Sequence, residues 1–93
     1  MVRPKKKRRI NFQPQAVYFK PRGRPLAELQ EEELNIDEIE AIRLCDKDGL
    51  SQTKAAKKMN VSQSTLRRIL VSARQKVARA LTEGRAILIE KEN

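Results

Sequence analysis

The apolar positions between Leu50 and Leu70 follow the pattern of two short helices joined by a tight turn. In the first segment, Ala55, Ala56 and Met59 recur at the three- and four-residue spacing of one buried helical face. Asn60 follows directly, and asparagine tolerates the left-handed conformation that commonly ends a helix. The pattern therefore predicts a helix that ends in a sharp turn near residue 60.

A second helix is predicted to begin immediately after this turn. Val61 is apolar and would plug the space beneath the turn, and Ser62 is a favourable N-cap residue. The apolar spacing of a buried face then continues through Leu66, Ile69 and Leu70. Together the two segments have the spacing of a helix-turn-helix, with four residues left facing outward from its second helix: Gln63, Ser64, Arg67 and Arg68.

The second helix is predicted to be long, because its apolar stripe does not stop at Leu70. The stripe runs on through Ala73, Val77, Ala80 and Leu81 as far as Gly84, which makes about five turns. The preceding helices are too short to cover this far half. We therefore expect residues 77–81 to pack on the N-terminal strand or on a second subunit.

Two further helical segments are predicted before the helix-turn-helix. After Pro25, residues 26–34 would form a short helix with an apolar edge and an acidic outer face. Asn35 would cap a firmer helix with Glu38 as its capping-box partner, and Gly49 would end it. The broad apolar face of that firmer helix comprises Ile36, Ile39, Ala41, Ile42, Leu44 and Cys45.

The ends of the chain are predicted to contain short strands. Residues 85–90 are a β-prone apolar run, and residues 10–20 hold short extended pieces that Pro14 restricts to a sheet edge. We expect 85–90 to pair with residues 8–19, within or between chains. The fold is thus predicted to be mainly α, with three parts: a basic arm with short strands (1–24), a helical domain (25–83, helix-turn-helix 51–81), and a C-terminal strand and tail (84–93).

The net charge of +9 is unevenly distributed along the 93 residues. Residues 1–24, 25–50 and 51–93 carry net charges of +9, −7 and +7. Such segregation indicates a polyanionic partner, for which nucleic acid is the leading candidate, although charge can also serve solubility alone. No apolar run approaches the length of a membrane-spanning helix. We therefore expect a cytoplasmic protein that associates with the nucleoid.

Two basic segments are candidates for contacts with DNA. The arm at residues 1–9 is expected to bind phosphates, although its charge also resembles a nuclear-localisation tract. Its candidate contacts are Lys5, Lys6, Lys7, Arg8 and Arg9. Residues 20–25, KPRGRP, resemble an AT-hook, in which an extended chain places arginines in a narrow minor groove. Here Arg22 and Arg24 are the candidates, and the alternative is a charged linker.

The sequence gives little support to catalysis or metal binding. It contains no histidine and one cysteine, Cys45, so neither a His-based triad nor an ordinary zinc site can be built. Cys45 is expected to be a small core residue rather than a redox-sensing thiol. The carboxylates of Asp37, Glu38 and Glu40 are expected to form a solvated helix face. We predict a protein that is not an enzyme and has no cofactor or metal.

Two resemblances follow from these motifs. Residues 40–81, EAIRLCDKDGLSQTKAAKKMNVSQSTLRRILVSARQKVARAL, resemble the region 4 helix-turn-helix of sigma factors. Across nearly the whole chain, the segments RPKKKRR, YFKP, LxELxEEEL, DEIEAIRL, LSQ and VSxST and the closing strand resemble a family of small prokaryotic proteins described as predicted DNA-binding proteins. The resemblance implies a sigma-region-4-like fold of three to four helices and DNA binding. Asn60 stands where a turn glycine is frequent.

The docking geometry of such motifs assigns roles to individual residues. The second helix enters the major groove, so Arg67 and Arg68 would contact guanine or clamp phosphates. Gln63 would contact adenine, and Ser64 and Thr65 would bond phosphate or base. The start of the first helix would contact the DNA backbone through Ser51, Gln52 and Lys54.

The predicted function is that of a sequence-specific regulator of transcription. It would bind double-stranded DNA, as a homodimer whose two recognition helices reach successive major grooves. RNA polymerase would be a further partner, and no membrane is involved. Two alternatives stay open: a basic RNA-binding or ribosome-associated protein, and a protein-interaction adaptor that uses the acidic surface of residues 28–48.

Overall fold

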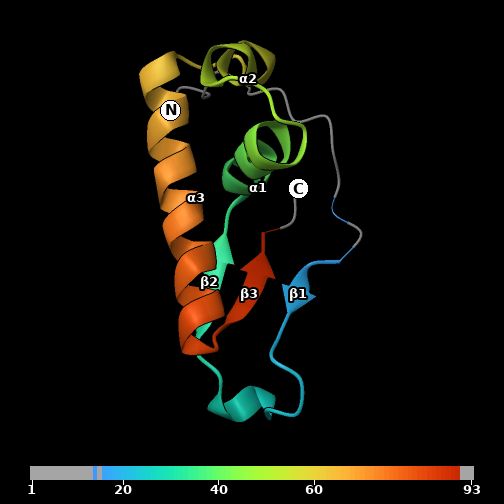
Figure 1. Cartoon of the computed structure of the whole chain (residues 1–93). Coiled ribbons are helices and arrows are strands. Elements are labelled where there is room, and N and C mark those ends of the chain that lie inside the picture. Colours follow the sequence, from blue (N-terminus) through green and yellow to red (C-terminus); the bar gives the residue numbers. More distant parts are fainter. Residues whose placement is uncertain (1–13, 15, 91–93) are drawn as a thin grey trace, which may run out of the picture.

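Three helices and a small sheet make up the computed structural model, which describes residue 14 and residues 16–90 (Figure 1). The helices are α1 (Ile36–Ile42), which continues into a π-helical turn η2 (Arg43–Lys47), α2 (Gln52–Met59) and α3 (Gln63–Glu83). The strands are β1 (Tyr18–Phe19), β2 (Glu31–Leu34) and β3 (Ala86–Ile89), and a short 3-10 helix η1 (Leu26–Glu28) precedes β2. These elements confirm the prediction of a mainly α chain with short strands near both ends.

Local capping sets the helix boundaries, as the sequence predicts. The side chain of Asn35 accepts a hydrogen bond from the Glu38 N–H, and the Glu38 carboxylate accepts one from the Asn35 N–H, each at 2.9 Å. Ser51 and Ser62 cap α2 and α3. At its other end α3 stops at Gly84, whose φ of 67° favours glycine. These contacts satisfy backbone groups that the helix ends would otherwise leave unpaired.

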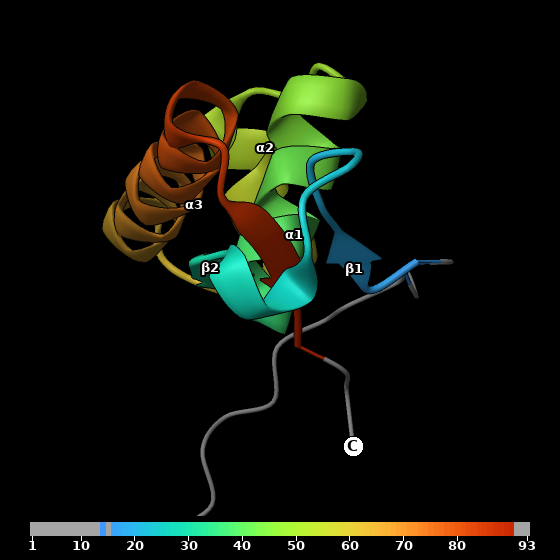
Figure 2. The same ribbon diagram turned by 90° about the horizontal axis from the view of Figure 1, so that it is seen from below.

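The three strands form one sheet in the order β1-β3-β2. Tyr18 pairs with Leu88 in the antiparallel edge strand β1, so the expected pairing of the two terminal strands occurs within one chain. Strand β2 runs parallel to β3, with Leu34 opposite Ile89. Parallel neighbours require a crossover connection, and here α1, α2 and α3 together supply it. Figure 2 shows β3 between β2 and β1, with α3 to one side.

The interior divides into a helical part and a part beside the sheet. The helical part packs seven side chains that are at least 96% buried: Ala41, Leu44, Ala55, Ala56, Met59, Leu66 and Leu70. Beside the sheet, Leu34, Ala73, Ala80, Ala86 and Ile89 are buried. Helix α3 contributes to both parts, so it is the element on which the rest of the chain packs. None of the helices in the described residues is both long enough and apolar enough to cross a membrane.

The prediction of a helix over residues 26–34 is wrong. Only Leu26–Glu28 is helical, as one 3-10 turn, and Glu31–Leu34 is a strand. Glutamate and leucine favour helices, but hydrogen bonding to β3 overrides that local preference. Alternation then buries Glu32 and Leu34 and leaves Glu31 and Glu33 exposed. Leu26, expected on the core, is 60% exposed.

Candidate nucleic-acid interface

The turn between α2 and α3 has a fixed geometry. Asn60 has φ 59° and ψ 47°, the left-handed conformation predicted for it, and its N–H reaches the carbonyl oxygens of Ala56 and Lys57. The Val61 N–H donates to the Ala56 oxygen at 3.0 Å, and the Val61 side chain packs against the helical core. Because both ends of the turn are held by backbone bonds and by packing, α2 and α3 cannot reorient freely.

The first residues of α3 are linked to the turn and to α2. Ser62 Oγ accepts from the Thr65 N–H at 3.1 Å and lies 2.9 Å from Thr65 Oγ1. The side chain of Gln63 donates to the hydroxyl of Thr53 in α2. Thr65 is half-buried in this cap, whereas Gln63 and Ser64 are exposed. Thr65 is therefore placed to hold the helix start, and Gln63 and Ser64 present polar groups to solvent.

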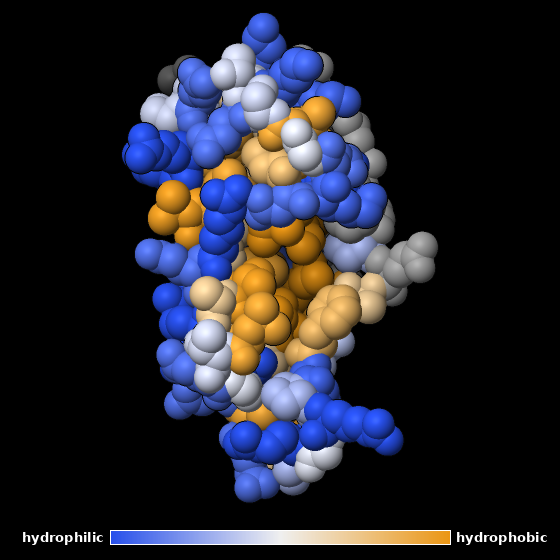
Figure 3. Space-filling model, in the orientation of Figure 1, coloured by the Kyte–Doolittle hydropathy of each residue, from blue (hydrophilic) through white to orange (hydrophobic). Residues whose placement is uncertain are grey.

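Helix α2 presents a second exposed polar surface beside the start of α3. Ser51 Oγ accepts from the Lys54 N–H at 3.2 Å, so this candidate for a DNA-backbone contact caps α2. Gln52 and Lys54 are exposed, and so are Lys57 and Lys58 on the following turn. Mostly hydrophilic residues cover this upper end of the molecule, where α2 and the start of α3 lie (Figure 3).

Arg67 and Arg68 differ from the other cations of α3 in their pairing. Both are exposed, and neither forms an ion pair with any residue in the described part of the chain. Further along the helix, Arg74, Lys76 and Arg79 each bind a carboxylate at 2.7–3.1 Å. The cationic charge of α3 is thus available to an external anion only in its first half.

The expectation that Glu38 and Glu40 lie on a solvated helix face is wrong. Their exposed fractions are 3% and 1%, because α1 turns this face toward α3 and η2. Glu38 accepts hydrogen bonds from Ser72 Oγ at 2.6 Å and Lys76 Nζ at 2.9 Å. Glu40 binds the Arg43 guanidinium through two bonds of 2.7 and 3.0 Å. Asp37 from the same expected face is half-buried.

Glu32 is a second buried acid that ties separate elements together. From β2 its carboxylate accepts two hydrogen bonds of 3.1 Å from Arg79 of α3 and one of 2.9 Å from Arg85. Every buried side-chain nitrogen and oxygen in the described residues has a hydrogen-bond partner. Sequence analysis missed this role of Glu32. No local signal could have found it, because Glu31, Glu32 and Glu33 are identical residues and only the strand pairing distinguishes them.

Acid is expected to destabilise the fold through Glu32 and Glu38. Hydrogen bonding from Arg79 lowers the pKa of Glu32 below its ordinary 4.5. Burial alone would raise the pKa of Glu38, but bonds from Ser72 and Lys76 outweigh it, so this pKa is also lowered. A carboxyl group with a lowered folded pKa stabilises the fold above its unfolded value and loses that contribution as pH falls through the folded one.

The resulting prediction concerns unfolding by urea as a function of pH. The free energy of unfolding should vary little through these two groups between about pH 7 and pH 5 and decline below about pH 4.5. Glu38→Gln removes one of the two titrating groups, so its decline should be shallower. The same acid dependence in the variant and the wild-type protein would contradict the assignment.

The KPRGRP segment lies at the C-terminal end of α3, far from the turn between α2 and α3. The chain turns at Arg22 and Gly23, where φ is 81°, so this part is not the extended run that an AT-hook-like contact requires. The Arg24 guanidinium lies beside Gly84 at the C-terminal end of α3, 3.8 Å from the point that a Cβ would occupy if Gly84 had a side chain. A 21-residue helix of about 30 Å separates it from the start of α3. Lys5 to Arg9 lie outside the described residues.

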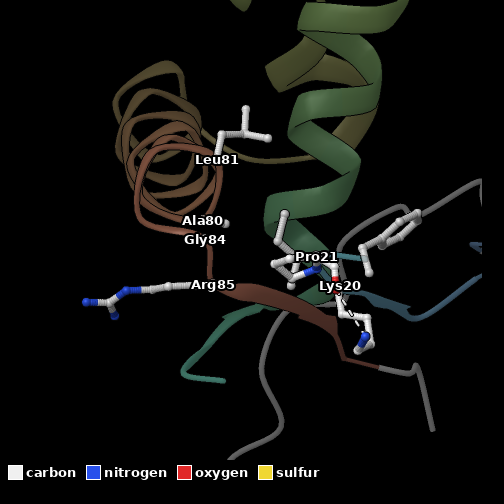
Figure 4. Close-up of a pocket in the computed structure, with 8 residues that line it drawn as sticks. Lys20, Pro21, Ala80, Leu81, Gly84 and Arg85 are labelled. Atoms are coloured by element: carbon white, nitrogen blue, oxygen red, sulfur yellow. Dashed lines mark hydrogen bonds between the residues drawn. The ribbon is translucent and has the colours of Figure 1, made fainter. Parts of the chain in front are cut away.

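An apolar groove occupies the same lower half. The volume of the groove is about 320 Å³. Figure 3 shows a hollow, mostly apolar area in the middle of the face that it presents. Leu81, expected to be covered by a strand or a second subunit, is 77% exposed at its rim. The Arg85 guanidinium points away from the other lining side chains (Figure 4). The lining residues are Phe19, Lys20, Pro21, Ala80, Leu81, Gly84, Arg85 and Ile87.

Two further features of the described residues concern metal binding and thiol chemistry. No cluster of three or more His, Cys, Asp or Glu side chains among them is arranged to hold a metal ion. Cys45 is half-buried against the helical core, and burial raises the pKa of its thiol. A raised pKa reduces the thiolate fraction, so the contacts of Cys45 fit packing better than reactivity.

Comparison with known proteins gives the family. The family described as "Protein of unknown function DUF134" matches residues 1–93. The chain belongs to this family. Similar relatives in it are UPF0251 proteins of Halothermothrix orenii (50% identical), Desulforudis audaxviator (52%) and Moorella thermoacetica (53%), each over 90 residues and 97% of this chain. The chain spans 67%, 59% and 60% of the lengths of these relatives.

Membership in the DUF134 family confirms the resemblance to a family of prokaryotic proteins, and the DNA binding which that resemblance implied stays a prediction. No solved structure matches this chain. The likeness to region 4 of sigma factors therefore stays a prediction, which rests on the helix-turn-helix geometry of α2 and α3.

Proposed function

We propose that this chain is a sequence-specific double-stranded DNA-binding protein that regulates transcription. The observation that carries the proposal is the pairing pattern of the α3 cations. Arg67 and Arg68 are exposed and without an ion pair in the described residues, whereas Arg74, Lys76 and Arg79 are neutralised internally. The position of Arg67 and Arg68 on the second helix of a fixed helix-turn-helix suits contact with the major groove.

The surroundings of α3 support the same orientation on DNA. With the start of α3 in the major groove, α2 crosses the sugar-phosphate backbone. The exposed ammonium groups of Lys54, Lys57 and Lys58 then meet phosphates, which contribute affinity irrespective of sequence. The basic arm, whose residues 5–9 lie outside the described part, would add contacts of the same kind.

The polar residues at the start of α3 divide into two groups. Ser64 is exposed, and the Gln63 amide keeps its oxygen as an acceptor while its nitrogen donates to Thr53, so these two suit contacts with base edges. Ser51 and Ser62 are committed to helix capping, and Thr65 to the cap of α3. Sequence discrimination is therefore assigned first to Arg67 and Arg68.

The acidic segment supports DNA binding over the adaptor alternative. An adaptor would present the carboxylates of residues 28–48 to a basic partner. Five of the acids in that segment instead bind cations of the same chain at 2.7–3.5 Å: Glu32, Glu38, Glu40, Asp46 and Asp48. Their charge is largely neutralised within the fold, which leaves the unpaired cations as the dominant electrostatic feature.

Selection of bound sequences from random duplex DNA tests the proposal. We expect enrichment of one motif, bound about a thousandfold more tightly than random duplex, with two symmetric half-sites because we propose that the protein acts as a homodimer at the nucleoid. A single-stranded RNA of the same sequence is the competitor. Failure to enrich any motif would reject sequence-specific DNA binding. Equal binding of that RNA would reject it in favour of the RNA alternative.

A further inference from the structure

Val71 is an apolar residue on the outward face of α3. Its side chain is 47% exposed, and the only other large apolar side chain of the helix with comparable exposure is Leu81, at the opposite end beside the groove. Val71 follows Arg67 by four residues and Arg68 by three. On a helix that turns about 100° per residue, it therefore lies one turn further along, between the directions of the two arginines.

The position of Val71 along the helix limits what it can touch. Residues 63–71 span about 12 Å of helix axis, close to the width of the major groove. On the next turn, Arg74 binds Asp46 through bonds of 2.7 and 3.2 Å, so the run of side chains without an internal partner is interrupted there. Val71 is thus the last outward-facing residue of α3 before its cations become internally paired.

We propose that Val71 contacts the C5-methyl group of a thymine adjacent to the bases contacted by Arg67 and Arg68. A valine side chain has no hydrogen-bonding group, so it gains only from contact with an apolar surface. Of the four bases, thymine alone presents a methyl group in the major groove. This inference rests on the proposed function, and it adds a base type and a specificity-determining residue to it.

The test uses the duplex selected by the wild-type protein, with each thymine replaced in turn by deoxyuridine, which lacks only the methyl group. At one thymine of each half-site, the wild-type protein should bind about fourfold more weakly, the value of one buried methyl group. For Val71→Ala, deoxyuridine at that position should not change the affinity, because this variant lacks the two valine methyl groups that would contact the thymine. Leu81→Ala, at an exposed position on the same helix, should retain the wild-type pattern.

The outcomes separate the two proposals. If the wild-type protein enriches no duplex, the proposed function fails and this inference fails with it. If a motif is enriched but the deoxyuridine profiles of wild-type protein and Val71→Ala coincide, DNA binding stands and the role of Val71 is overturned. A uniform loss of affinity in Val71→Ala for all duplexes, with an unchanged profile, would also overturn it.

Discussion

Replacing Arg67 and Arg68 together by alanine is expected to lower the affinity for the selected duplex by about 100-fold or more. A bidentate contact between arginine and guanine provides about 1–3 kcal/mol of discrimination, and 1.4 kcal/mol corresponds to a factor of ten. Both side chains are exposed and unpaired within the described residues, so the described part of the fold loses no ion pair. Fluorescence anisotropy on the selected and on a scrambled duplex measures the change.

Arg74→Ala is the matched control for this loss. It removes one positive charge from the same helix, as each substitution of the double variant does, but Arg74 already binds Asp46 and lies past the proposed contact face. We expect its affinity for the selected duplex to fall much less than that of the double variant. Circular dichroism should show unchanged helix content in all variants, since alanine favours helices. Equal affinities for the double variant and Arg74→Ala would refute the assignment of Arg67 and Arg68.

The helical half of the fold could be predicted because its determinants are local. Asn35, Ser51 and Ser62 cap helices through side chains that reach three residues along the chain, and Asn60 ends α2 through its own backbone conformation. The outward direction of Arg67 and Arg68 follows from the periodicity of Leu66 and Leu70 in the same helix. Such features need no knowledge of distant residues.

The sheet half could not be predicted in the same way. The segment Glu31–Leu34 has the composition of a helix, and it becomes a strand because β3, more than 50 residues later, pairs with it. The burial of Glu32 depends in turn on Arg79 and Arg85, which reach it only after that pairing. Which cations of α3 stay unpaired follows from the same long-range contacts, so the candidate site was only partly visible in the sequence.

Glu38→Ala is expected to reduce the free energy of unfolding by about 3 kcal/mol. Glu38 is 3% exposed and joins α1 to α3, because it completes the cap of α1 and accepts bonds from Ser72 and Lys76 of α3. Its removal leaves the Ser72 hydroxyl and the Lys76 ammonium without their carboxylate, and it opens a space between α1 and α3. Urea unfolding followed by circular dichroism measures the loss.

Two control variants test whether the loss of stability comes from removing a carboxylate that is buried and paired. Glu33→Ala removes an exposed carboxylate from strand β2, so its cost should stay within about 0.5 kcal/mol. Glu38→Gln keeps one oxygen, which can accept from the Asn35 N–H, but it places an NH2 group where the second oxygen accepted from Ser72 and loses the charge facing Lys76. Because the side chain still fills the space between α1 and α3, its loss should be smaller than that of Glu38→Ala. If Glu38→Ala cost no more than Glu33→Ala, the buried carboxylate would not be holding α1 against α3. This contact fixes α3 against α1 at Ser72 and Lys76, so it supports the same helix on which Arg67 and Arg68 are proposed to meet DNA.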